Sequence, residues 1–325
     1  MSQPEMWRPI ASMQMLQTRA KLLRSIRDFF WQREILEVDT QVLSLTSISD
    51  PYIEVLSTSA KCLGKEQTYY LQSSPEFAMK RLLAAGSGCI YQMSKVFRKE
   101  ENSRRHSIEF TLLEWYRLGL DDWQLMAEVE ELIISVSQDA SLRCDYKSYQ
   151  DAFLTYADVD PFEAKLSQLQ QLAHQHTEYG LDETDRDALL DLIFNALIEP
   201  KIGFERPCFI HSYPASQAAL AKTKQNFEGL ETAKRFELYW RGMELANGYH
   251  ELTDGQEQAS RFNRDNQLRM AQGKEVRALD ENLLGALAAG LPNCAGVALG
   301  IDRLLMVLSQ SQDIQEVMPF AKERV

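Results

Sequence analysis

Apolar residues recur at helical spacing along several stretches of the chain. In the segment 13–34 they fall on one broad face of a helix, and Ser12 stands where the N-cap of that helix is expected. The same reasoning predicts helices over 77–85, 122–138, 165–175, 185–198, 256–271 and 302–309.

Shorter apolar runs predict β-strands. Two of them, 90–97 and 110–118, are joined by a polar, basic stretch, which is the pattern of a long hairpin with a charged loop. Together with the helices, they indicate an α+β fold in which helices flank an antiparallel sheet. We expect one domain over 1–325, with a helical insertion around 122–200. Further strands are predicted at 36–38, 69–72, 208–213, 235–240 and 296–299.

Composition and charge narrow the classes of partner. The 325 residues include 35 Lys and Arg against 47 Asp and Glu, a formal net charge of −12. Because phosphate neutralisation needs clustered cations, we expect no direct nucleic-acid binding. Five scattered cysteines without a C-x-x-C pair indicate reduced thiols and no structural zinc site. No apolar run reaches the length of a membrane span or resembles a signal peptide, so we expect a cytoplasmic protein without membrane contact.

Charged residues concentrate in the loop of the predicted hairpin. Arg98 ends the first strand, and an arginine there projects a planar, always-charged group that can grip a phosphate oxygen. On its own, the pattern fits a solvated hairpin tip with ion pairs equally well. The charged residues of this loop are Arg98, Lys99, Glu100, Glu101, Arg104, Arg105 and His106.

A second candidate anion site lies near the C-terminus. Small residues over 296–300 allow a ligand to approach the backbone closely. Arg303 then stands at the start of a predicted helix, where its charge opposes the helix dipole, so it has reason to face an anion. A plain strand-to-helix turn is the alternative interpretation.

Two glutamates, Glu244 and Glu251, flank a short strand-like segment. Side chains alternate along a strand, so these two point to opposite faces unless the backbone bends or bulges, which Gly248 permits. Convergent carboxylates suit Mg²⁺ on ATP phosphates or an ammonium group. Two surface glutamates on an edge strand remain the alternative.

The segment 73–76 has the pattern of a helix start. Ser74 stands at the expected N-cap, Pro75 at the first helical position and Glu76 in the first turn. Taken alone, this pattern indicates the N-terminus of a helix and no binding role. The order of all these segments along the chain is more informative than any one of them.

In this order the segments resemble the three signature motifs of class II aminoacyl-tRNA synthetases, and most closely those of the lysyl-tRNA synthetase branch. The predicted helix from residue 13, together with the segment 35–40 in which it ends, is similar to motif 1, the dimerisation element. Phe97, Arg98, Glu100 and His106 with 109–111 are similar to motif 2, and 296–303 is similar to motif 3.

The resemblance is closer still to one family within this branch. Lysyl-tRNA synthetases carry an N-terminal OB barrel that reads the anticodon, and motif 1 begins here near residue 13, so no anticodon-binding domain is expected. In this respect the chain resembles the elongation factor P lysine ligases. That resemblance implies a homodimeric, ATP-dependent and Mg²⁺-dependent ligase that activates (R)-β-lysine as an adenylate and passes it to a lysine of elongation factor P.

The resemblance also implies residue roles. Arg98 would grip the α-phosphate, His106 and Arg303 the far end of the triphosphate, and Glu100 and Phe110 the adenine. The implied catalytic residues are Arg98 and Arg303, and the implied metal ligands are Glu244 and Glu251. The implied ATP-binding residues are Arg98, Lys99, Glu100, His106, Ser107, Phe110, Glu244, Leu245, Gly300 and Arg303. The implied substrate-binding residues are Ser74, Pro75, Glu76, Glu114, Tyr116, Asn247 and Glu251, so Glu251 is assigned to both metal and amine.

Three departures from the motifs bear on these roles. Gln41 stands where motif 1 has its proline, so the dimer contact differs in detail. Ser107 and Ile108 replace an Asn-Pro pair, which removes a side-chain contact to adenine if one is made there. Ala298 stands where lysyl-tRNA synthetases tend to have Gly, and its methyl group is expected to reshape the amino-acid pocket.

Other functions remain open on the sequence. A truncated lysyl-tRNA synthetase-like enzyme would activate α-lysine, and a regulatory paralogue would bind without catalysis. An asparagine synthetase of the same fold would need cationic specificity residues, which Glu76 and Glu251 do not provide. No residue stands out as the base for the transfer step.

Overall fold

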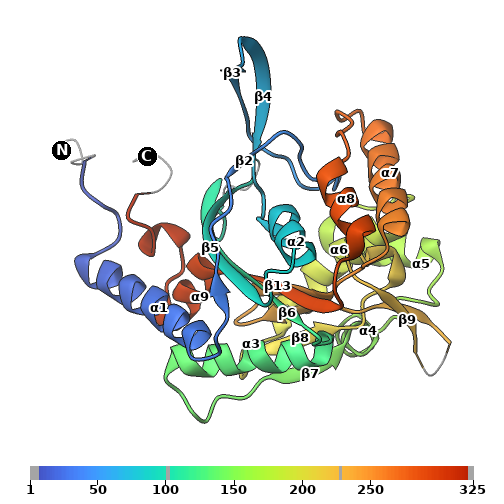
Figure 1. Cartoon of the computed structure of the whole chain (residues 1–325). Helices are drawn as coiled ribbons and strands as arrows, with labels where there is room; N and C mark the ends of the chain where they lie inside the picture. The colour runs from blue at the N-terminus through green and yellow to red at the C-terminus, as the bar shows by residue number, and fades with distance from the viewer. Residues whose placement is uncertain (1–6, 100–102, 227–228, 321–325) are drawn as a thin grey trace, which may run out of the picture.

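One eight-stranded sheet dominates the computed structural model, which describes residues 7–99, 103–226 and 229–320 (Figure 1). Its six central strands pair antiparallel, as predicted, whereas the outer strands β1 and β7 pair in parallel with β5 and β8. In spatial order the strands are β1 (Leu36–Glu37), β5 (Ile90–Phe97), β6 (Glu109–Leu118), β13 (Cys294–Gly300), β12 (Glu244–His250), β11 (Arg235–Tyr239), β8 (Cys208–His211) and β7 (Asp145–Ser148).

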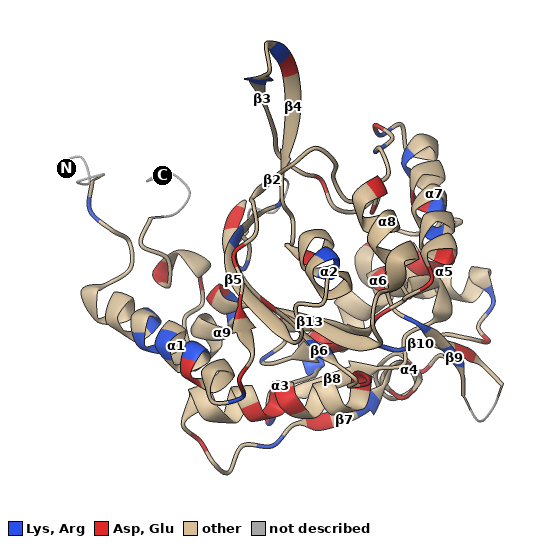
Figure 2. Ribbon diagram, viewed as in Figure 1, with Lys and Arg blue, Asp and Glu red and all other residues tan. Residues whose placement is uncertain are grey.

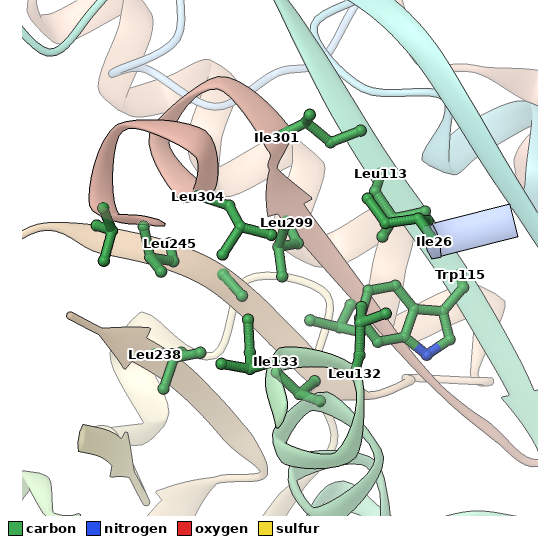
Figure 3. Close-up of a cluster of buried hydrophobic side chains, with 14 of the residues drawn as sticks. Ile26, Leu113, Trp115, Leu132, Ile133, Leu238, Leu245, Leu299, Ile301 and Leu304 are labelled. Atoms are coloured by element: carbon green, nitrogen blue, oxygen red, sulfur yellow. The ribbon is translucent and has the colours of Figure 1, made fainter. Parts of the chain in front are cut away.

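Three helices cover one face of this sheet and enclose the main hydrophobic core. They are α1 (Met13–Trp31), α3 (Asp122–Ser137) and α9 (Ile301–Ser309). Alternation along β6 points Leu113 and Trp115 into this core, where both are fully buried. Figure 3 shows them packed with side chains of all three helices and with Leu238, Leu245 and Leu299 from the sheet.

The opposite face carries α2 (Glu76–Ala84), α7 (Gly255–Ala271) and α8 (Glu281–Gly290). A smaller apolar cluster joins these helices to the sheet through Met79, Phe262, Leu283 and Tyr116. It holds them against only part of the sheet, and the functional pocket opens beside it. Helix α2 begins at Glu76 with Pro75 as its N-cap, so Pro75 and not Ser74 holds the N-cap position, although Ser74 Oγ accepts a hydrogen bond from the backbone N–H of Glu76 at 3.0 Å.

The region 122–200 contains the expected helices, but they do not all pack together. Helix α3 belongs to the main core, and β7 joins the large sheet. The remaining helices share a separate core with β8 and β11, in which Tyr149, Phe153 and Phe194 are buried. These helices are α4 (Tyr149–Tyr156), α5 (Leu166–Thr177), α6 (Arg186–Ile193), a π-helical turn (Phe194–Ile198) and a 3₁₀ turn (Glu199–Lys201).

Smaller elements complete the described chain. A three-stranded sheet projects from the body as a narrow arm, with Leu63 fully exposed at its tip (Figure 1). None of the helices described is long and apolar enough to cross a membrane. All five cysteines are free, as expected. The elements not yet given are β2 (Leu43–Ser44), β3 (Ser57–Cys62), β4 (Lys65–Leu71), β9 (Thr223–Gln225), β10 (Glu231–Ala233) and 3₁₀ turns at Ala215–Gln217 and Ile314–Glu316.

Candidate active site

A cavity of about 350 Å³ opens on the sheet face that carries α2 and α8. Most of the predicted site residues line it. The exceptions are Pro75, which lines a smaller neighbouring cavity, Lys99, which is exposed outside it, and Glu100, which lies outside the described residues. The lining residues among those predicted are Ser74, Glu76, Arg98, His106, Ser107, Phe110, Glu114, Tyr116, Glu244, Leu245, Asn247, Glu251, Gly300 and Arg303.

Strand register builds the floor of the cavity. One row runs across four strands as Glu114, Ala298, Asn247 and Glu237, each paired with the next. Paired residues point to the same side of a sheet, so all four side chains face the cavity. Ala298 therefore lies between Glu114 and Asn247, which sequence alone did not place together.

A backbone irregularity brings Glu244 to the same face. Leu238 pairs with Ala246 and Tyr239 with Glu244, so one step on β11 spans two on β12. The extra residue, Leu245, reverses the alternation and turns Glu244 toward the cavity, on the side of Asn247. The predicted bulge exists, but at Leu245 and not at Gly248.

One end of the cavity is acidic. Glu76 from α2, Glu114 from β6 and Glu251 after β12 converge there. Ser74 and Tyr116 each donate a hydrogen bond to Glu114, at 2.7 Å. These contacts fix the Glu114 carboxylate from two sides. An acidic, largely desolvated pocket of this kind suits ammonium groups.

Next to this group, Asn247 offers a further acceptor. Its Oδ1 is buried and receives no hydrogen bond from any residue that the structure describes. A buried acceptor without a donor costs free energy, so a ligand N–H is the natural partner for it.

Lys80, which the sequence analysis missed, lies behind the acidic end. Its Nζ is 2.7 Å from Glu76 Oε1 and 2.6 Å from Glu251 Oε2, and its side chain is 1% exposed. The spacing of four residues from Glu76 was the available signal, because such pairs are neighbours on one helix face.

Burial sets the protonation of the acidic end. Burial, supported by nearby Glu76, raises the pKa of Glu114 to about 7. Burial also raises the pKa of Glu251 to about 8, although Lys80 opposes that shift. Burial lowers the pKa of Lys80, but Glu251 and Glu76 outweigh it, and the net shift is upward. The acidic end of the cavity thus holds two carboxyl groups whose pKa values lie near neutral pH.

The other end of the cavity is basic. Arg303 in the first turn of α9 donates to Nε2 of His106 at 2.6 Å and to the carbonyl oxygen of Glu244 at 2.8 Å. The guanidinium of Arg98 lies 5.3 Å from the centre of the Phe110 ring. Motif 2 and motif 3 residues thus meet around one space, with planar donors suited to phosphate oxygens.

A second unpredicted group, Arg235 and Glu237 on β11, lines the floor between the two ends. Glu237 accepts hydrogen bonds from Arg235 at 2.5 Å, Tyr213 at 2.6 Å and Tyr239 at 2.5 Å. Sequence reasoning missed this pair because it treated 235–240 as an apolar strand. The alternation of Arg235, Glu237 and Tyr239 along the strand was the signal that could have found it.

The site's fit to Mg²⁺ rests on few carboxylates. Among residues 7–99, 103–226 and 229–320, no three His, Cys, Asp or Glu side chains form a metal-binding group. Mg²⁺ in nucleotide sites needs only one or two carboxylates besides phosphates and water. The Glu244 carboxylate lies 3.6 Å from an Arg303 nitrogen, whereas the buried Glu251 carboxylate lies 2.6 Å from Lys80 Nζ. This arrangement fits a metal at Glu244 better than one shared with Glu251.

Together these features define a class of protein: an antiparallel sheet whose cavity has an acidic end suited to amines beside an arginine-rich end suited to phosphates, as in amino-acid-activating enzymes. The family model for tRNA synthetases class II (D, K and N) matches residues 6–324. Proteins named elongation factor P--(R)-beta-lysine ligase from Pseudoalteromonas translucida and Vibrio cholerae are 48% and 47% identical to the chain, over 97% of it and 97% of each relative. The chain belongs to the class II tRNA synthetase family and, within it, to the family of these ligases.

Proposed function

We propose that the chain is an ATP-dependent ligase that activates (R)-β-lysine as an adenylate and transfers it to a lysine side chain of elongation factor P. The acidic end of the cavity carries this proposal. Three carboxylates and the Asn247 Oδ1 atom, which accepts no hydrogen bond from the described residues, lie at the acidic end, beside the end that contains Arg98 and Arg303. This arrangement suits a diamino acid whose ammonium groups bind at the acidic end and whose carboxylate faces ATP at the basic end. The acceptor protein rests on the names of the relatives.

In the first step the substrate carboxylate attacks the α-phosphorus of ATP and pyrophosphate leaves. The carboxylate is ionised at neutral pH, so this step needs no general base. Arg98 neutralises charge at the α-phosphate, while His106 and Arg303 hold the β- and γ-phosphates. The chain's contribution is thus positioning and charge stabilisation.

Bound Mg²⁺ would supply further charge neutralisation on the phosphates. Glu244 is the residue placed to hold it, with Glu237 beside it. We assign Glu251 to the substrate amine and not to the metal, because it lies with Glu76 and Glu114 and contacts Lys80.

In the second step the acceptor amine attacks the adenylate carbonyl and AMP leaves. The attacking amine must lose a proton, and we assign no side chain of this protein as its base. The AMP phosphate is a chemically available acceptor for that proton.

Two further properties follow from the family resemblance. We propose a homodimer, because large apolar side chains near motif 1 are exposed: Trp31 at 82%, Leu36 at 54% and Leu45 at 58%. We place the protein in the cytoplasm, without direct contact to nucleic acid, in line with its free thiols and net charge of −12.

ATP–pyrophosphate exchange tests the proposal. The amino acids to compare are (R)-β-lysine, α-lysine and aspartate, followed by a mass measurement on elongation factor P. Exchange that prefers (R)-β-lysine, and a mass gain of one lysyl group, are expected. Preference for α-lysine would instead indicate a truncated synthetase, and absence of exchange with all three would indicate a regulatory paralogue.

A further inference from the structure

Lys80 is a buried cation that the proposed reaction does not use directly. It lies on α2 below the cavity, with its side chain 1% exposed. Its ammonium group bridges two carboxylates from different elements, Glu76 in its own helix and Glu251 after β12. Glu114 on β6 is a third carboxylate close enough to influence the same cluster. Lys80 thus joins the helix side of the pocket to the sheet side.

The net charge of this cluster indicates how many ammonium groups a substrate must supply. Three carboxylates and one ammonium leave two negative charges without a partner when all four groups are ionised. Three clustered carboxylates, of which Glu114 and Glu251 are buried, would not all ionise without a cation among them. A substrate with two ammonium groups supplies the two missing positive charges, and an amino acid with one ammonium group leaves a buried charge uncompensated.

We propose that Lys80 is a positioning and specificity residue: it orients the carboxylates of Glu76 and Glu251 and supplies one of the three positive charges that the cluster with Glu114 needs, so that the pocket is neutralised by a diamino acid and not by a monoamino acid. This inference rests on the proposed function for the identity of the diamino acid. Lys80 does not touch substrate in this arrangement and acts through the two carboxylates. Its upward-shifted pKa keeps its own amine protonated and therefore unreactive toward the adenylate.

Replacing Lys80 with Met tests the inference kinetically. The Lys80→Met variant leaves Glu251 buried without its cation, which raises the pKa of Glu251 further above about 8, so that this carboxyl group ionises only at higher pH. We expect the KM for (R)-β-lysine at about pH 7 to rise by about tenfold or more, with the KM for ATP within about twofold. The ratio of variant to wild-type KM should fall as pH rises to about 9. A ratio independent of pH, or equal losses for both substrates, would overturn the proposal.

Two matched variants separate charge from packing. Arg81→Met removes the same charge from the next residue of α2, which is exposed, and should leave both KM values unchanged. Lys80→Arg keeps the charge and should retain the wild-type pH profile even if its KM rises. If Lys80→Arg shifts the pH profile as Lys80→Met does, the positive charge at position 80 does not set the profile, and the inference is wrong.

A double-mutant cycle tests whether Lys80 acts through Glu76. The Lys80→Met change should raise the KM for (R)-β-lysine less in a Glu76→Gln background than in wild type, because one of its two partners is already uncharged. Equal effects in both backgrounds would contradict the inference.

Thermal unfolding provides a readout that does not depend on the substrate. In wild type the folded pKa of Glu251 is about 8. In Lys80→Met it is higher, so only the variant keeps the Glu251 proton as pH rises past 8, and its stability falls more steeply there. The Tm difference from wild type should therefore grow as pH rises above about 8. A constant difference would refute the role of Lys80, whereas wild type that exchanges no pyrophosphate with (R)-β-lysine would refute only the proposed function. A variant that folds only at low pH would support the inference.

Discussion

At the scale of single residues, the register of the sheet decides which atoms form the pocket floor. Ala298 pairs with Glu114 on one side and with Asn247 on the other, so its methyl group occupies the floor between the two proposed amine contacts. Removing this methyl group deepens the floor at that point. Amino acids that differ only in where an amine is attached should respond to such a change.

We predict that Ala298→Gly shifts the preference of the pocket from (R)-β-lysine toward α-lysine. A change of one methyl group in a pocket is worth about 1–3 kcal/mol, or about 10- to 200-fold in specificity. The measurement is the ratio of kcat/KM for the two amino acids in pyrophosphate exchange. Ala295→Gly is the matched control, because Ala295 points from the same strand into the main core and should lower stability without changing the ratio. An unchanged ratio in Ala298→Gly would show that the methyl group does not set specificity.

Position 296 requires glycine, because a larger side chain does not fit there. A Cβ atom at this position would lie 2.3 Å from Cε1 of Tyr116 and 2.5 Å from Oε1 of Glu251. We predict that Gly296→Ala displaces both side chains, raises the KM for the amino acid by about tenfold or more and costs about 1–3 kcal/mol of stability. The KM for ATP should change little. Gly285→Ala on α8 is the control, because no atom lies within 4 Å of the position that its Cβ atom would take. A Gly296→Ala variant that binds the amino acid as wild type does would contradict the packing argument.

At the scale of elements, strong periodicity made some parts predictable. The β5–β6 hairpin has long apolar runs bounded by charges, and its observed bounds, Ile90–Phe97 and Glu109–Leu118, agree with prediction to one residue. Helix α1 also begins where expected, with Ser12 accepting a hydrogen bond from the Met15 backbone at 3.1 Å. Helix α8 was missed because its Ala- and Gly-rich sequence has little amphipathic pattern.

Features that depend on packing between elements were not predictable. No local signal marks the bulge at Leu245, which arises from the pairing of β11 with β12. Lys80 gains its role from Glu251, which is distant in sequence and meets it only in the folded chain. The sequence therefore identified most residues of the site but not the side of the sheet on which Glu244 emerges, nor the cation beneath the acidic end.

The acidic end, built by α2, β6 and β12, predicts a pH dependence. Burial raises the pKa of Glu114 to about 7 and of Glu251 to about 8, and a protonated carboxyl group cannot neutralise an ammonium group. We predict that the KM for (R)-β-lysine falls as pH rises from about 6 to about 8. The KM for ATP serves as the internal control in the same exchange assays. A KM for (R)-β-lysine that is flat over this range would contradict the assignment of these carboxylates to the amines.

The same shifts have a consequence for the stability of the free protein. Both folded pKa values lie above those of unfolded glutamate, so the stabilising contribution is present at low pH and is lost as pH rises through about 7 and 8. Bound (R)-β-lysine should offset this loss, which a Tm series with and without the amino acid would measure. A ligand-induced gain in Tm that does not grow with pH would argue against this coupling.

At the scale of the whole molecule, α1 is tied to the active site through buried charges. Arg19 on this helix contacts Asp302 at 2.5 Å and donates to the Thr111 hydroxyl at 2.8 Å. Asp302 in turn accepts from the backbone N–H of Thr111 at 2.6 Å and directly precedes Arg303. Figure 2 shows Lys and Arg positions in blue along the α1 ribbon, with acidic positions in red on α3 beside it. A partner that fixes α1 would therefore also steady the segment that carries the motif 3 arginine.

The last prediction concerns that partner, a second copy of the chain packed on the exposed apolar residues near motif 1. Replacing Trp31, which is 82% exposed, with Glu should weaken the dimer by about 2–4 kcal/mol, or about 30- to 1000-fold in Kd. Sedimentation velocity over a concentration series measures this shift, and pyrophosphate exchange at the same concentrations shows whether activity falls as monomer appears. Leu63→Glu is the matched control, because Leu63 is fully exposed at the tip of the projecting arm, away from α1 (Figure 1). A wild-type chain that is monomeric at micromolar concentration would refute the dimer, whereas a Trp31→Glu monomer with full activity would show that the link from α1 through Asp302 to Arg303 does not need a partner.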